Sequence, residues 1–387
     1  MEKRLLGKTG ETASILGFGC MRLPVRDPAD QGSIDLDAAT AMLRRAIDRG
    51  VNYVDTAYAY HRSGGMTEHG RSEYFLAHAL KDGYREKVNI ATKLPTWFME
   101  DVPHMNRTLD EQLGALDVKC IDFYLAHNLN SRVWPKMRDM GMLDFLRDAQ
   151  RDGRIRHVGF SFHDNYRMFE DVMDSYDWSF AQVQYNYLDT DHQAGTRGVE
   201  LAAGRGLGVI VMEPLRGGFL VSRMPEDLRA FLREMRPEWS LADWALRWCW
   251  SRADVGTVLS GMSTMDQVEE NLDIADAFTP LTPDEHAALE KVRSAFKARS
   301  KVDCTACGYC MPCPVGVNIP NVFAMYNDYY LVEGKENQDR ARMMYGLMVR
   351  PEQEARHCIS CGVCETKCPQ NIAISREMPE AAKLFHG

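Results

Sequence analysis

The sequence predicts an α/β protein in which a (β/α)8 TIM barrel is followed by a small, mainly α-helical domain. Eight short apolar runs alternate with amphipathic stretches over about 270 residues, the number expected of such a barrel. The glycine-rich phosphate motif that follows the first strand of an open dinucleotide-binding sheet is missing. Eight of the eleven cysteines lie beyond residue 303, which predicts that the C-terminal region is a separate domain.

The predicted strands are short runs of apolar and β-branched residues, as is typical of buried parallel strands. They cover residues 15–22, 53–57, 88–93, 121–127, 155–162, 180–186, 207–212 and 255–261. The amphipathic stretches between them predict helices around the barrel, at residues 37–49, 71–80, 135–151 and 241–251. An open, doubly wound sheet is the alternative, because the number of strands alone does not prove that the sheet closes.

The predicted domain limits follow from where this alternation stops. The barrel spans residues 1–281, and the charged, alanine-rich residues 282–300 predict a helical connector. Residues 301–387 form the predicted C-terminal domain. Helical patterns at residues 321–331 and 336–348, between the two groups of cysteines, predict that this domain is mainly α-helical.

The C-terminal cysteines form two tight runs, Cys304-x2-Cys307-x2-Cys310-x2-Cys313-Pro314 and Cys358-x2-Cys361-x2-Cys364-x3-Cys368-Pro369. The second run matches the bacterial ferredoxin pattern, and the first has one spacer residue fewer. In that pattern the fourth cysteine binds the neighbouring cluster, so two [4Fe–4S] clusters with crossed ligands are predicted. One would be held by Cys304, Cys307, Cys310 and Cys368, and the other by Cys358, Cys361, Cys364 and Cys313. Zinc ribbons and disulfides are the alternatives, but zinc ligands usually form two separated pairs.

The composition excludes several classes of function. The chain has 46 basic and 55 acidic residues, and its net charge of −9 argues against nucleic-acid binding. The sequence has no apolar segment long enough to span a membrane and no N-terminal signal segment. Cysteines kept for metal rather than for disulfides predict a reducing compartment, and we expect the protein to be cytoplasmic.

Polar residues end three successive strands of the predicted barrel. Asp55 and Tyr60 follow the second strand, Lys93 ends the third, and His127 ends the fourth. Reactive residues of (β/α)8 enzymes lie at these strand ends. With these residues and the opening Leu6-Gly-Lys-Thr-Gly and Leu16-Gly-Phe-Gly-Cys-Met-Arg, the first 280 or so residues resemble the aldo-keto reductase family. The whole chain resembles the branch of that family with a C-terminal two-cluster ferredoxin domain.

The four residue types suit the reduction of a carbonyl group. Tyr60 can donate a proton to the oxygen, and we expect the Lys93 ammonium to lower the pKa of this phenol. Asp55 can hold Lys93 charged, and His127 can donate a hydrogen bond to the carbonyl oxygen. Each residue alone also has an ordinary structural explanation, but all four at successive strand ends favour catalysis.

The resemblance also implies contacts to a nicotinamide cofactor. Ser161 and Gln182 would bind the carboxamide, although Phe162 stands where an asparagine is usual, and Met212 would lie against the ring. The pyrophosphate loop would comprise Pro214, Leu215, Arg216 and Gly217. At the adenosine end, the resemblance points to Gln267, Glu270 and Asn271.

The adenosine end departs from the pattern of NADPH-preferring relatives. Residues 259–267, where a lysine and an arginine would surround a 2′-phosphate, contain no basic residue. NADH, NADPH or no nicotinamide at all therefore remain open. A flavin would leave no short motif in a barrel, and no flavin signature is seen.

We therefore predict an oxidoreductase that converts a small-molecule carbonyl, an aldehyde or ketone, to an alcohol or the reverse. Hydride transfer moves two electrons and each cluster moves one, so the clusters are structural or serve a ferredoxin-like electron-transfer partner. Two alternatives remain: a ferredoxin-fed one-electron reductase without nicotinamide, and a non-catalytic electron-transfer subunit of a larger redox complex.

Overall fold

The computed structural model describes residues 1–387 apart from residues 66, 305–307, 332–333 and 387. The chain forms two compact units. The first comprises Met1–Pro214 and Ala245–Pro280, and the second comprises Leu215–Trp244 and Leu281–Gly387. The segment Leu215–Trp244 thus packs with the C-terminal region. The division into a barrel at residues 1–281, a connector at 282–300 and a C-terminal domain at 301–387 stays a prediction.

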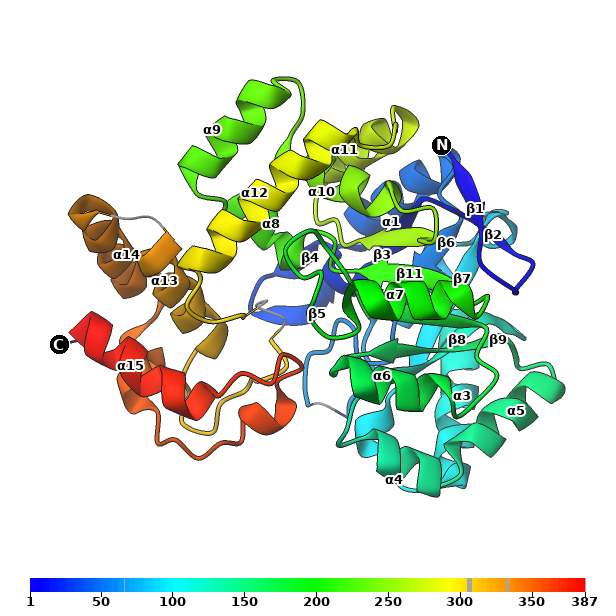
Figure 1. Ribbon diagram of the computed structural model, residues 1–387. Coiled ribbons are helices and arrows are strands. Elements are labelled where there is room, and N and C mark those ends of the chain that lie inside the picture. The colour runs from blue at the N-terminus through cyan, green and yellow to red at the C-terminus, as the bar shows by residue number, and fades with distance from the viewer. Residues whose placement is uncertain (66, 305–307, 332–333, 387) are drawn as a thin grey trace. The chain divides into compact units, whose positions relative to one another are not determined.

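The first unit contains a closed barrel of eight parallel strands, which confirms the predicted fold (Figure 1). Around the barrel the strands follow the order β10-β11-β12-β3-β6-β7-β8-β9. They are β3 (Leu16–Gly19), β6 (Tyr53–Asp55), β7 (Asn89–Leu94), β8 (Ile121–Leu129), β9 (Ile155–Phe162), β10 (Phe180–Gln184), β11 (Gly208–Met212) and β12 (Thr257–Ser260). All eight predicted runs form barrel strands, because each run has the apolar composition that a strand buried on both faces requires.

The N-terminal end of the barrel is closed by its own side chains and by a hairpin. Tyr53, Phe123 and Phe180 belong to one buried cluster inside the barrel, together with Leu6. Leu6 directly follows β1 (Lys3–Leu5), which pairs antiparallel with β2 (Thr12–Ser14). A second hairpin, β4 (Val25–Asp27) with β5 (Asp30–Ile34), follows β3 at the opposite, C-terminal end of the strands.

Helices alternate with the strands of the first unit. They are α1 (Leu36–Asp48), α2 (Ser72–Ala79), α3 (Val102–Leu116), α4 (Trp134–Asp139), α5 (Met142–Arg151), α6 (Tyr166–Met173), α7 (Gly195–Gly204) and α11 (Met265–Asp276). The single helix predicted over residues 135–151 is wrong, because the chain breaks into α4 and α5 at Gly141, whose φ is +90°. Helix α10 (Leu241–Trp250) matches the predicted helix at residues 241–251.

The second unit is helical, as predicted. Its helices are α8 (Phe219–Ser222), α9 (Glu226–Met235), α12 (Pro283–Arg299), α13 (Ile319–Leu331), α14 (Lys335–Met348) and α15 (Ile374–His386). Helix α12 covers the predicted connector, and a capping box at Thr282 and Glu285 starts it. An ion pair between Arg299 and Asp227 at 2.8 Å fastens α12 to α9.

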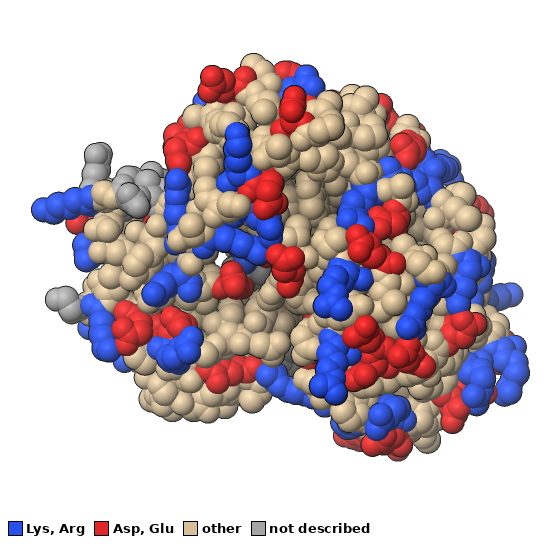
Figure 2. Space-filling view, viewed as in Figure 1, with Lys and Arg blue, Asp and Glu red and all other residues tan. Residues whose placement is uncertain are grey.

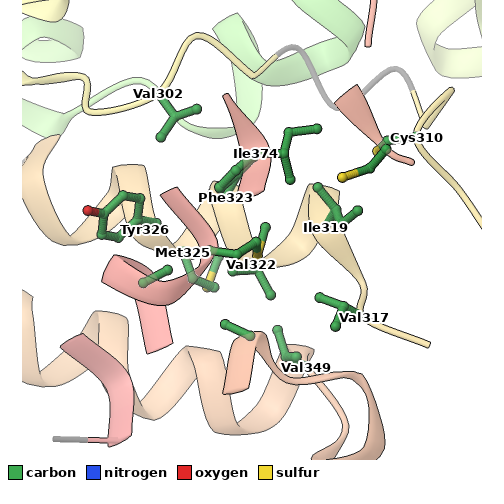
Figure 3. Close-up of a cluster of buried hydrophobic side chains, with 14 of the residues drawn as sticks. Val302, Cys310, Val317, Ile319, Val322, Phe323, Met325, Tyr326, Val349 and Ile374 are labelled. Carbon is green, nitrogen blue, oxygen red and sulfur yellow. The ribbon is translucent and has the colours of Figure 1, made fainter. Parts of the chain in front are cut away.

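The core of the C-terminal region lies between α13, α14 and α15. Val322 and Phe323 of α13 are fully buried; Phe323 lies beside Ile374 of α15, and Val322 lies toward Val349, which follows α14 (Figure 3). Cys310, Cys364 and Cys368 belong to the same buried cluster. Apolar packing in this unit is therefore continuous with the two cysteine runs.

Charge on the molecular surface is mixed. On the face shown in Figure 2, acidic and basic side chains alternate, and no broad area of that face carries only basic residues. Within the described parts of the chain, we find no helix with the length and apolar character needed to cross a bilayer.

Candidate functional site

The four residues predicted to be catalytic lie at the C-terminal ends of three adjacent strands. Asp55 is the last residue of β6, Lys93 is the penultimate residue of β7, and His127 lies near the end of β8. Tyr60 follows in the loop after β6. Because β6, β7 and β8 are neighbours in the barrel, the fold brings these side chains to one place.

Lys93 is the centre of this group and is fully buried. Its Nζ donates to both carboxylate oxygens of Asp55, at 2.8 and 2.7 Å, and to the carbonyl oxygen of Thr56 at 2.6 Å. The same Nζ lies 3.4 Å from the hydroxyl oxygen of Tyr60. The Asp55 and Thr56 oxygens accept hydrogen bonds from the Lys93 ammonium and hold its nitrogen beside the phenol oxygen of Tyr60.

Burial dominates the electrostatics of these residues. It lowers the pKa of Lys93 and raises the pKa of Asp55, while the ion pair between them opposes both changes. Burial of its hydroxyl end, with the Asp55 charge as the next cause, raises the pKa of Tyr60 well above its ordinary value. This differs from the expected lowering by Lys93, because Asp55 neutralises the ammonium at close range. The phenol therefore stays protonated, as a proton donor must.

His127 completes the group as a neutral imidazole. Burial, followed by the charge of Lys93, lowers the pKa of His127 well below its ordinary value. Its Nδ1 is buried and has no hydrogen-bond partner among the described residues. The ring centre of His127 lies 6.3 Å from that of Tyr60 and 5.2 Å from that of Trp97. The Tyr60 residue as a whole is half-buried.

A buried carboxylate that lies behind Lys93 was not identified from the sequence. Glu73 of α2 is fully buried and accepts hydrogen bonds from Gln112 at 2.8 Å, from Thr92, and at 2.5 Å from His69. Gln112 also donates to the carbonyl oxygen of Lys93 at 3.1 Å. The network therefore holds the backbone of β7 at Lys93 in place. No local pattern marks Glu73, because its partners come from other segments of the chain.

Three of the predicted nicotinamide contacts lie together on adjacent strands. Ser161 on β9 is paired in register with Gln182 on β10, and Gln182 lies beside Met212 at the end of β11. The Gln182 amide nitrogen lies 3.5 Å from the Met212 sulfur. The Gln182 Oε1 is buried and has no hydrogen-bond partner among the described residues, so it is an acceptor available to a ligand's amide group. This part of the site fits a nicotinamide carboxamide.

The remaining predicted cofactor residues are distributed over both units. Pro214 ends the first segment of the first unit, whereas Leu215, Arg216 and Gly217 belong to the second unit. Arg216 is buried, and its guanidinium lies 3.8 Å from the carboxylate of Asp303 in the same unit.

On α11, two of the three predicted adenosine contacts are occupied by bonds within the protein. The Gln267 side-chain oxygen accepts from the backbone nitrogen of Ser263 at 2.8 Å. Asn271 is buried and donates to the Ser260 hydroxyl at 2.8 Å. Glu270 is exposed.

The cysteines of the second unit line two cavities. One is lined by Cys313, Cys358, Cys361 and Cys364. The other is lined by Cys304, Cys310 and Cys368. Cys307 lies outside the described residues. The first cavity therefore combines the first three cysteines of the second run with Cys313, the fourth cysteine of the first run. The second cavity combines Cys304 and Cys310 of the first run with Cys368, the fourth cysteine of the second run.

The two cysteine runs also fold alike. Gly308 and Gly362, which occupy the same place in each run, both have positive φ, +79° and +71°. Six residues after the last cysteine of each run, Ile319 and Ile374 begin α13 and α15. Both isoleucines line both cavities and so lie between them. Thiol groups around apolar cavities of this kind fit iron–sulfur clusters, whose ligands are cysteine thiolates.

A buried histidine beside His127 gives the protein a predicted pH dependence. Burial lowers the pKa of His163 to about 4, whereas the unfolded chain protonates this group near 6.5. Stability from neutral His163 is thus complete above pH 6.5 and is lost as the pH falls toward 4. Between pH 7 and pH 5 we expect a loss of about 2 kcal/mol in the free energy of unfolding from this residue.

Denaturant unfolding of the wild type and of His163→Asn at pH 7 and pH 5 measures the free energy of unfolding of each protein. Visible absorption checks that both proteins contain their clusters. The variant should lose less stability between pH 7 and pH 5 than the wild type. Equal losses in the two proteins would show that His163 does not carry the effect.

Comparisons with known proteins match both parts of the chain. The description "Aldo/keto reductase family" applies to residues 15–294, and "4Fe-4S dicluster domain" applies to residues 303–373. A probable voltage-gated potassium channel subunit beta of Arabidopsis thaliana is 23% identical over 78% of this chain and 98% of that protein. Probable aldo-keto reductase 1 of Glycine max is 28% identical over 55% of this chain and 59% of that protein.

A solved structure is also similar. The aldo-keto reductase AKR11C1 from Bacillus halodurans, in its holo form, is 27% identical and superposes with a TM-score of 0.61. The match covers 76% of this chain and 96% of that one.

Proposed function

The chain belongs to the aldo/keto reductase family and carries a 4Fe-4S dicluster domain, and on that premise we propose that it interconverts a carbonyl compound and an alcohol with a nicotinamide cofactor. One observation carries the proposal. The buried Lys93–Asp55 ion pair, with contacts of 2.7 and 2.8 Å, lies against the hydroxyl of Tyr60. A buried charge pair is costly to build, so its place beside a protonated phenol supports a catalytic role.

Tyr60 is the proposed proton donor. A bound nicotinamide would supply the hydride that the carbonyl carbon receives. Tyr60 gives its proton to the carbonyl oxygen, which completes the alcohol, and the phenolate then regains a proton from solvent. Because burial raises the pKa of Tyr60, the phenol holds its proton until the substrate oxygen becomes basic.

Lys93 acts on the Tyr60 oxygen, and His127 acts on the carbonyl oxygen that receives the proton. The Lys93 ammonium, 3.4 Å from the Tyr60 oxygen, stabilises the phenolate during the moment it is charged. Neutral His127 can donate a hydrogen bond from one ring nitrogen to the carbonyl oxygen and so position it. Asp55 keeps Lys93 charged and directed at the phenol.

The dicluster domain is the proposed site of one-electron chemistry. Cys313, Cys358, Cys361 and Cys364 would hold one cluster, and Cys304, Cys307, Cys310 and Cys368 the other. The backbone nitrogen of Ser360 donates to the Cys358 sulfur at 3.4 Å, a contact that also suits a thiolate ligand. We propose a ferredoxin-like electron partner for this domain and a reducing, cytoplasmic location, since both clusters need reduced cysteines.

The experiment that tests this function measures binding of NADH and NADPH to anaerobically purified, cluster-loaded protein by calorimetry. We expect at least one nucleotide to bind and to support turnover of a simple aldehyde. Absence of binding by both nucleotides, with iron content intact, would overturn the hydride-transfer proposal. It would leave an electron-fed reductase or an electron-transfer subunit as the function to test.

A further inference from the structure

Arg22 occupies a defined place at the C-terminal rim of the barrel. It ends the short 3-10 helix Cys20–Arg22 that follows β3. Its carbonyl oxygen accepts a hydrogen bond from the Ser263 hydroxyl at 2.8 Å. The next backbone nitrogen, of Leu23, donates to Nε2 of His61 at 3.2 Å. The backbone at Arg22 is thus tied on one side to the loop after β12 and on the other to the loop that carries Tyr60.

The side chain of Arg22 lies across the loop after β12. A Cβ atom placed on Gly261 would be 3.4 Å from Cγ of Arg22 and 3.5 Å from its Cβ and Cδ. The fold therefore brings an arginine to residues 259–267, the segment that has no basic residue of its own. Sequence proximity could not reveal this, because Arg22 and Gly261 are far apart along the chain and meet only where β3 pairs with β12.

The charge of Arg22 is not neutralised by the protein. The side chain is exposed, and among the described residues no carboxylate lies within ion-pair distance of it. By contrast, two arginines at the C-terminal end of α1, near α11, form ion pairs within the protein. Arg45 pairs with Glu269 at 2.6 Å and Arg49 with Asp276 at 2.6 Å. The Arg22 charge also reaches the reaction centre, because it is one of the groups that lower the pKa of Tyr60.

We propose that Arg22 binds a phosphate group of the nicotinamide dinucleotide at the junction of β3 and β12. The inference rests on the proposed function, because it assumes that a nicotinamide lies near Gln182 and Tyr60. A dinucleotide held there must extend its phosphates over the rim, and the planar guanidinium makes paired hydrogen bonds to phosphate oxygens. Gly261, which lacks a side chain, lets the Arg22 side chain lie close to the backbone of this loop. The phosphate is either the 2′-phosphate, present only in NADPH, or the pyrophosphate, present in both nucleotides.

The test compares nucleotide binding by the wild type, Arg22→Ala and Arg22→Lys, with clusters loaded and fold checked by circular dichroism. Arg26→Ala is the matched control, because Arg26 is also exposed and has no ion pair among the described residues. We expect Arg22→Ala to weaken binding by roughly 10- to 100-fold, the scale of a hydrogen bond to a charged group. Arg22→Lys should lie between the two, and Arg26→Ala should bind as the wild type does.

Each outcome decides something different. Loss confined to NADPH assigns Arg22 to the 2′-phosphate, and equal loss for NADH and NADPH assigns it to the pyrophosphate. Wild-type affinity of Arg22→Ala for both nucleotides would overturn the inference and leave the proposed function standing. Failure of the wild type itself to bind either nucleotide would overturn the proposed function, and the assignment of Arg22 with it.

Discussion

Replacing Tyr60 with phenylalanine should lower kcat for carbonyl reduction by at least about 100-fold and leave the iron content unchanged. The variant removes one hydroxyl group, the proposed proton donor, which lies 3.4 Å from Lys93. Steady-state kinetics with a simple aldehyde, together with iron analysis, checks both parts of the expectation.

Tyr58→Phe is the matched control for this prediction. Tyr58 lies two residues earlier in the same loop and is buried, but its hydroxyl faces Glu111 at 3.4 Å rather than Lys93. Removing that hydroxyl should leave turnover close to the wild type. If Tyr60→Phe turned over the aldehyde as fast as Tyr58→Phe, another group would have to supply the proton.

Replacing Cys358 with serine should remove one of two clusters, so that iron falls from about eight to about four atoms per chain. Cys358 is one of the four cysteines that line the cavity of Cys313, Cys361 and Cys364. Iron analysis, visible absorption and electron paramagnetic resonance of the reduced protein measure the loss. Cys120→Ser is the control, because Cys120 lies outside both runs, and this variant should keep all of its iron.

Two double variants test the crossed arrangement of ligands. Cys313→Ser with Cys358→Ser should remove the same single cluster, because both residues line one cavity. Cys358→Ser with Cys368→Ser should remove both clusters, because Cys368 lines the other cavity. If each run held its own cluster instead, the two double variants would exchange results.

The barrel could be predicted because its signal is local. Buried parallel strands must be apolar on both faces, so each strand is visible as a continuous run without any knowledge of its neighbours. The break at Gly141 was not predicted, because the amphipathic pattern of residues 135–151 continues through a glycine whose left-handed backbone divides α4 from α5. Helical periodicity reports which face is buried and does not report a local turn in the backbone.

The clustering of the proposed catalytic residues could be predicted for a similar reason, but their electrostatics could not. Asp55, Lys93 and His127 stand at strand ends, and the order of the strands places them together. The direction of the pKa change at Tyr60 depends on how deeply its hydroxyl is buried and on how closely Asp55 neutralises Lys93. The burial of the Tyr60 hydroxyl and the contact between Asp55 and Lys93 are properties of the folded protein, so the sequence does not report them.

The sequence alone determined a (β/α)8 barrel and a C-terminal iron–sulfur domain, because strand composition and cysteine spacing are local properties of the chain. Its resemblance to the aldo-keto reductases added that the protein is an oxidoreductase. Only the tertiary structure decided that Glu73 supports the backbone at Lys93, and that Arg22 lies across Gly261. These contacts join residues that strand pairing and helix packing bring together from distant positions. Closure of the barrel makes its first and last strands neighbours, and a linear pattern carries no record of that closure.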